Sequence, residues 1–191
     1  WAVVCAAVHA DELVAVLGGR VRVEATGPTS VGVVGPLALS GGRLCVDASK
    51  GGAPAVCGGP VSVTGGALDV LGGRWSAALG SGGELWGAPY PEASGPVPVV
   101  VGGGSLRAVA GEGCSFAIGN GTYDYGAPLW PTNGSARVYE HVVEGISDVT
   151  TLVVDGRPAS ELGVDSQNDD GKVHLWLTAG THSVRVDGRD E

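Results

Sequence analysis

The chain has 191 residues and a formal net charge of −9 at pH 7, with 20 acidic residues against 11 Lys and Arg. This charge repels a phosphate backbone and argues against nucleic-acid binding. With 35 glycines that follow no Gly-X-Y period, and 30 valines against 2 isoleucines and 1 phenylalanine, the composition excludes collagen and an all-helical fold.

Residues 1–17 form an apolar segment that carries no initiator methionine, so we expect a removed secretory signal and an extracellular protein. Asp11 and Glu12 interrupt the segment, which is too short to span a membrane. Read as a strand, it is apolar on both faces, which is typical of a strand donated to a neighbouring subunit. Pairing within its own sheet and a helix from Ala2 to Leu17 are the two alternatives. The expected assembly residues are Trp1, Val3, Val4 and Val8.

Short apolar runs separated by glycine follow along the rest of the chain. Many alternate with a period of two, as Val21 with Val23 and Leu68 with Val70 do, which is typical of strands. Strands this short, with turn signals between them, predict an all-β fold: an antiparallel β-sandwich resembling a jelly roll. The expected strands are 20–25, 31–39, 44–47, 60–64, 67–71, 74–79, 97–101, 106–110, 115–118, 137–143, 149–155, 172–178 and 182–187.

Glycine pairs recur every seven residues at 58–59, 65–66 and 72–73. A β-solenoid would produce such a repeat. We instead predict hairpins of one meander, because Gly-Gly supplies the positive φ of two-residue turns. Residues 18–191 are expected to form one composite β domain. The alternative is a division near residues 131–136, where the glycine content falls.

Four cysteines fit an oxidising compartment, and their spacing does not fit a zinc site. Cys45 and Cys57 lie on apolar runs joined by a loop that can fold back. We therefore predict a Cys45–Cys57 disulfide, which leaves Cys5 to pair with Cys114. Four buried thiols are the alternative.

Two N-glycosylation sequons lie close together, at Asn120 and Asn133. We expect both in exposed turns, because each asparagine precedes glycine. Aromatic residues in the same half of the chain could stack on sugar rings or fill the core. They are Trp75, Trp86, Tyr90, Tyr123, Tyr125 and Trp130.

An acidic loop is the best candidate for a metal site, with calcium as the expected ion. Its oxygen ligands would be Asp165, Asn168, Asp169 and Asp170, and a solvated hairpin turn is the alternative. His174 and His182 could face each other as a metal pair or as exposed polar residues. No sequence signature of a nucleophile or phosphate loop is present, so we expect no catalytic residue.

The apolar N-terminus, the Gly- and Val-rich strands, the sequons and the two lysines together resemble secreted β-rich subunits of archaeal surface filaments, such as threads and bundling pili. This resemblance implies a homopolymer assembled by donor-strand complementation. Calcium-assisted cannula-type tubes are a related family. We therefore expect a non-enzymatic structural subunit of an extracellular filament. The alternative is a carbohydrate-binding or adhesive β-sandwich module that recognises glycans.

Overall fold

The structure is a computed structural model that describes residues 5–81, 84–85, 88–89, 99–114, 117–120, 132–133, 136–158, 172–186 and 189–190. Within these ranges the chain is rich in strands and contains no α-helix. One short 3₁₀-helix, η1 (Val149–Thr151), lies in the C-terminal part.

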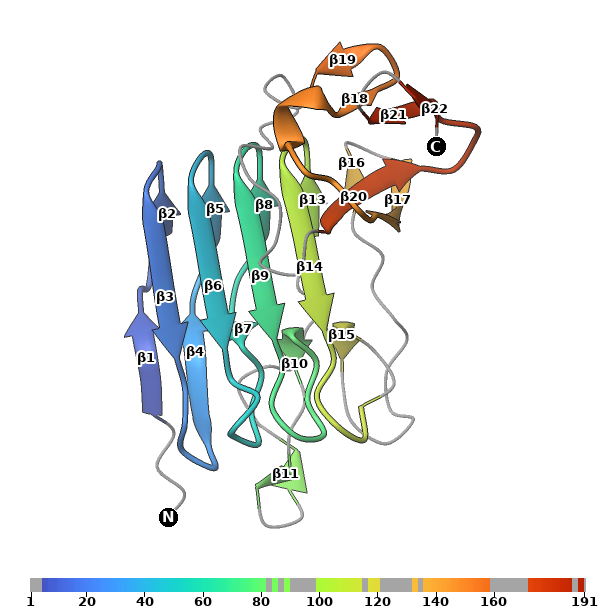
Figure 1. Ribbon diagram of the computed structural model, residues 1–191. Coiled ribbons are helices and arrows are strands. Elements are labelled where there is room, and N and C mark those ends of the chain that lie inside the picture. Colours follow the sequence, from blue (N-terminus) through green and yellow to red (C-terminus); the bar gives the residue numbers. More distant parts are fainter. Residues whose placement is uncertain are drawn as a thin grey trace.

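Three sheets wind the chain into a parallel β-solenoid (Figure 1). The first face holds β1 (Cys5–His9), β4 (Ser30–Val34), β7 (Val56–Cys57), β10 (Leu79–Ser81) and β15 (Ile118–Asn120). The second face begins with β2 (Val14–Val16), β5 (Leu37–Leu39), β8 (Val61–Val63), β13 (Val99–Val101) and β16 (Thr132–Asn133). The third face holds β3 (Arg20–Glu24), β6 (Arg43–Asp47), β9 (Ala67–Leu71) and β14 (Ser105–Val109).

The predicted antiparallel sandwich is therefore wrong. Along each face of the solenoid, neighbouring strands run parallel and come from successive coils, as in the pairs β1–β4, β2–β5 and β3–β6. The glycine-rich turns do not reverse the chain. They carry it around a corner from one face to the next, so that three strands complete one coil (Figure 1).

Residue pairing on the third face shows how regular the coils are. Arg20 faces Arg43 and Arg43 faces Ala67, so the first coils are nearly equal in length. Ala67 faces Ser105, so the last coil is clearly longer. Its additional residues lie between β10 and β13 and include a short antiparallel pair, β11 (Glu84–Leu85) and β12 (Ala88–Pro89).

The solenoid core consists of columns of aliphatic side chains, one from each coil. Leu44, Leu68 and Leu106 occupy paired positions on the third face and are each at most 1% exposed. Leu37 and Val61 make the equivalent column on the second face. Alternation with period two turns these side chains inward, so burial of stacked aliphatic residues stabilises the fold.

A column of glycines forms the corner between the second and third faces. Gly19, Gly42, Gly66 and Gly104 all have φ between +75° and +76°, a region that favours glycine. The coils also approach each other closely here. A Cβ added at Gly66 would lie 2.4 Å from the Gly42 carbonyl oxygen, which already accepts a hydrogen bond from the Ala67 amide.

The chain ends in a small β unit with its own core. Its strands are β17 (Ala136–Val143), β18 (Val153–Val154), β19 (Arg157–Pro158), β20 (Val173–Thr178), β21 (Val184–Val186) and β22 (Arg189–Asp190). Leu152, Val173 and Leu175 belong to a buried cluster separate from the solenoid core. β17 pairs antiparallel with β16 and with β20, so the second face continues into this unit.

Trp176 attaches the C-terminal unit to the last coils. Its side chain packs against the solenoid core, and its Nε1 donates a hydrogen bond to the Leu106 carbonyl of β14. The unit therefore covers the solenoid at the end opposite β1 (Figure 1).

Candidate functional site

The first coil, β1 to β3, has an open edge, because within the described residues no strand lies beyond it. Val21 occupies the same inward column as Leu44 and Leu68. It is 39% exposed, whereas the two leucines below it are 1% exposed. The cross-section of the core is thus presented to solvent at this end.

Two leucines flank β2 on the same edge. Leu13 is 54% exposed and Leu17 is 79% exposed, the highest values among the large hydrophobic residues that the structure describes. Exposed apolar residues gathered at one place are typical of interaction surfaces. We call β1 to β3 with these two leucines the open coil.

Some main-chain groups of β2 and its flanking residues also point away from β5, toward the open end of the solenoid. The Val14 amide donates to Pro36 O at 2.8 Å, and Val16 O accepts from the Ser40 amide at 3.0 Å. Because the two groups of one peptide unit point in opposite directions, the Leu13 carbonyl, both groups of Ala15 and the Leu17 amide are directed away from β5. These groups can form hydrogen bonds with a further strand.

The N-terminal strand itself is paired within its own chain. Cys5 faces Ser30 and Val8 faces Val33 in the parallel pair of β1 with β4. Val8 is half-buried and packs against the solenoid core. The other expected assembly residues, Trp1, Val3 and Val4, lie outside the described residues.

The cysteines predicted to pair lie on different faces of the solenoid. Cys57 is buried on the first face beside Val31 and Ala53, whereas Cys45 lies on the third face as a free thiol. The two are therefore not joined. Burial, and then the nearby Asp69 carboxylate, raises the pKa of Cys45. The Cys5 side chain lies outside the described residues, so the Cys5–Cys114 pairing stays a prediction.

An ion-pair cluster covers the outside of the third face. Asp69 Oδ2 accepts from Arg43 Nη2 at 2.7 Å, and both side chains are largely buried, at 6% and 12% exposure. Arg107 Nη1 lies 3.9 Å from Asp69 Oδ1, which has no hydrogen-bond partner among the described residues. Nearby, Arg22 bonds Glu24 in an exposed pair. These contacts stabilise a face of the solenoid and do not expose a reactive group.

A histidine bridge holds the C-terminal unit together. His182 Nδ1 lies 2.7 Å from Asp155 Oδ2, and Nε2 lies 2.7 Å from Thr178 O. A carboxylate and a carbonyl can only accept, so both ring nitrogens donate when the imidazole is protonated. The bond to Asp155, followed by the bond to Thr178, raises the pKa of His182. The bond from His182, followed by that from the Ser183 amide, lowers the pKa of Asp155.

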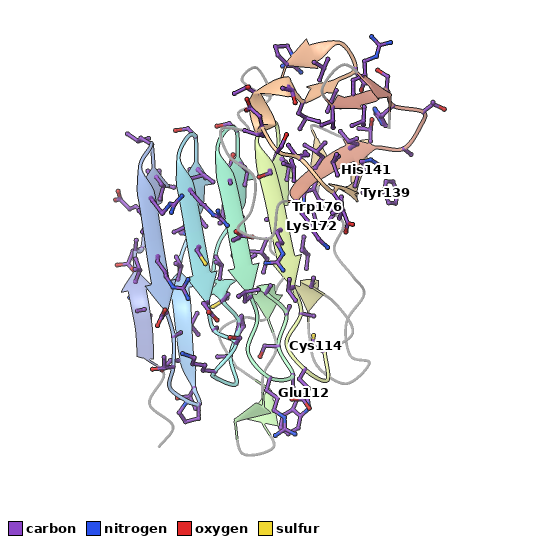
Figure 2. All side chains as sticks on the ribbon, viewed as in Figure 1. Glu112, Cys114, Tyr139, His141, Lys172 and Trp176 are labelled. Atoms are coloured by element: carbon purple, nitrogen blue, oxygen red, sulfur yellow. The ribbon has the colours of Figure 1, made fainter. Side chains whose placement is uncertain are left out.

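Two hollows border this bridge, of about 160 Å³ and about 540 Å³. Trp176 and Arg157 help to line the smaller one, and Tyr139 and His141 the larger one. Figure 2 shows Tyr139 and His141 on the C-terminal unit, far from Glu112 and Cys114 at the lower end of the coils. Both hollows are partly open to solvent.

The remaining predicted sites are only partly described. The acidic loop with Asp165 and Asp170 lies outside the described residues, as do most of the predicted aromatic residues. In the described part of the chain, no three His, Cys, Asp or Glu residues gather as a metal site. Asn120 and Asn133 end the strands β15 and β16, and the turns expected after them lie outside the described residues. Trp75 lies beneath the Arg74 guanidinium, 4.1 Å from ring centre to Cζ.

Comparison with family models, curated proteins and solved structures finds no match to this chain. Among the described residues, no helix is long and apolar enough to cross a membrane.

The edge formed by Leu13, Ala15 and Leu17 was not among the sites expected from the sequence. The signal lies in a block that recurs at 13–24, 36–47, 60–71 and 98–109, in which alternating aliphatic residues surround Gly-Gly. When these blocks are aligned, residues 13–24 are the first of the four copies, and their strands lie at one end of the described sheets.

Proposed function

We propose that the protein is a non-enzymatic structural subunit of an extracellular filament that joins a neighbouring copy through its open coil. The observation that carries this proposal is the contrast between Val21, which is 39% exposed, and the buried leucines of the same column. A solenoid core needs a cover at each end. At the other end of this solenoid, the C-terminal unit provides one.

The chemistry of the edge supports pairing with another protein chain. Natural edge strands usually carry charges or proline that block such pairing. β2 has neither, and its flanking residues are Leu13 and Leu17. Strand addition would supply main-chain hydrogen bonds, and burial of the leucines would add affinity. Because β1 is paired with β4 of the same chain, we place the joint at the coil edge rather than at a donated strand.

The extracellular location remains part of the proposal. Its support is the composition: two N-glycosylation sequons and only two lysines in a chain of 191 residues. The proposal also assigns no catalytic role. In the described part of the chain, the principal charged clusters are Arg43 with Asp69 and His182 with Asp155, and both are engaged in ion pairs within the fold.

Sedimentation velocity over a range of concentrations, with negative-stain microscopy, tests the proposal. We expect reversible association that Leu17→Lys weakens without lowering the melting temperature, because Leu17 is already 79% exposed. Val100→Lys is the matched control, since Val100 is 37% exposed on the second face but lies three strands from the edge. It should associate like the parent chain.

A chain that stays monomeric at every concentration would contradict the proposal. That result would favour the alternative function, a carbohydrate-binding module. The hollow of about 540 Å³ beside Tyr139 and His141 would then be the first place to look for a glycan.

A further inference from the structure

We propose that two copies of this chain join by their open coils about a two-fold axis, with β2 of one copy antiparallel to β2 of the other. This inference rests on the proposed function, since it specifies how the open coil is covered. Four features of the coil support it: its sequence symmetry, the direction of its backbone groups, the order of its strands and its charges.

The sequence of this edge is a palindrome. Residues 13–17 read Leu-Val-Ala-Val-Leu in both directions. Antiparallel self-pairing centred on Ala15 places Leu13 opposite Leu17 of the second copy, and Val14 opposite Val16. The two most exposed large hydrophobic residues that the structure describes would therefore cover each other twice in one contact.

The backbone groups are directed correctly for the same register. The Leu13 carbonyl, both groups of Ala15 and the Leu17 amide point outward, as the bonds from Val14 and to Val16 show. In antiparallel pairing, a hydrogen-bonded pair forms where the backbone N–H and C=O groups of both residues point toward the partner strand. Centring on Ala15 lets each Ala15 amide donate to the other Ala15 carbonyl, and each Leu17 amide donate to the Leu13 carbonyl of the second copy.

The order of the strands around the coil permits this axis. β2 lies between β1 and β3 along one coil, so a two-fold axis through Ala15 places β1 of one copy opposite β3 of the second copy. All three edges are then covered. An axis through the middle of β3 would instead place Arg22 opposite Arg22 of the second copy, and like charges directly opposite each other destabilise strand pairing.

Charge is complementary at the corners. Counting outward from Ala15, Glu12 falls opposite Gly18 and Asp11 falls opposite Gly19 of the second copy, next to its Arg20. The Asp11 side chain is 93% exposed in the single chain, so it is accessible for such a contact. Opposite charges across an interface favour the correct register.

Head-to-tail stacking has no comparable support. The second face continues past β16 into β17 and β20, and Trp176 of β20 packs on the last coils. At that end, the described strands therefore do not leave three unpaired strand edges on which the open coil of a second copy could stack. A two-fold contact needs only the one surface, so it joins two copies into a pair, and growth of these pairs into a filament needs a second contact elsewhere on the chain.

Introducing opposite charges at the two ends of the palindrome, residues 13 and 17, tests the register. Leu13→Glu and Leu17→Lys should each weaken dimerisation by about 100-fold, since each removes two apolar contacts per dimer. The double variant should regain about 10-fold or more, because the new glutamate of each copy then faces the new lysine of the other copy. Within one chain these side chains are about 13 Å apart and cannot pair.

Cross-linking gives an independent readout. Ala15→Cys should form a homodimeric disulfide, because hydrogen-bonded antiparallel partners have Cα atoms about 5.5 Å apart. Ala38→Cys, the next residue on the same outer face, is the control and should not. Association without that disulfide-linked peptide and without rescue by the double variant would overturn the two-fold register while the proposed function stands. A monomer at all concentrations would overturn both.

Discussion

Replacing Gly66 by alanine should destabilise the protein far more than the same change at Gly19. Both glycines have a positive φ, +76° and +75°, so both substitutions place a Cβ in a left-handed conformation at about 1–2 kcal/mol. The surroundings differ. At Gly66 the new Cβ would lie 2.4 Å from Gly42 O and 2.9 Å from Gly42 N, whereas at Gly19 no atom of the described residues lies within 4 Å.

The clash at Gly66 involves main chain, which cannot rotate away. To restore an ordinary contact of about 3.4 Å, adjacent coils must separate by about 1 Å and strain the bond from the Ala67 amide to Gly42 O. A lost hydrogen bond costs about 1 kcal/mol, and loosened packing adds to it. We expect Gly66→Ala to lose about 3 kcal/mol or more and Gly19→Ala about 1 kcal/mol, out of a typical total of about 5–15 kcal/mol.

Urea denaturation followed by circular dichroism measures both losses under identical conditions. Equal losses for the two variants would refute the reasoning, because they would show that only local backbone strain matters. The stacked corner, and with it the coil register, would then be incorrect.

Three further predictions concern titrating and charged groups. The stabilisation from His182 should be complete below pH about 6.5 and decline as pH rises through its raised pKa, whereas that from Asp155 should be lost as pH falls through its lowered pKa. The melting temperature, measured against pH, should fall both below the lowered pKa of Asp155 and above the raised pKa of His182. In His182→Ala the fall at high pH should be absent. Asp69→Asn should cost about 3 kcal/mol by leaving the largely buried Arg43 guanidinium uncompensated. Glu24→Gln, in an exposed pair, should cost less than about 1 kcal/mol. Urea denaturation measures both losses. Cys45 should react slowly with iodoacetamide at pH 8, because its pKa is raised; mass mapping that finds it in a disulfide would contradict the structure.

Strand content could be read from the sequence, but strand direction could not. The alternation at Leu68 and Val70 correctly indicated strands, and both side chains point into the core. A period of two shows which side chains share a face, but neighbouring strands may run either way. Each Gly-Gly was interpreted as a hairpin turn. At Gly66 the same positive φ instead turns a corner, and the next strand belongs to another sheet.

The seven residues from one glycine pair to the next span one of the three sides of a coil. Three sides make one coil, and the longer last coil, from Ala67 to Ser105, hides this period from a simple repeat search. The same error affected the cysteines. A hairpin would bring Cys45 close to Cys57, but a corner separates them onto different faces. The open edge at Leu17 became visible only when the coils had been assigned.

The cover at one end gives the solenoid a direction. Each coil contacts mainly its neighbours, so local unfolding should proceed one coil at a time from one end. β3 has a neighbour on one side only among the described strands, and Val21 is partly hydrated, whereas β14 is held by Trp176 from the C-terminal unit. Fraying therefore begins at the first coil, and amide protons should exchange fastest there and progressively more slowly toward β14. Docking at the open coil would slow exchange along the whole stack, because it closes the end from which opening starts.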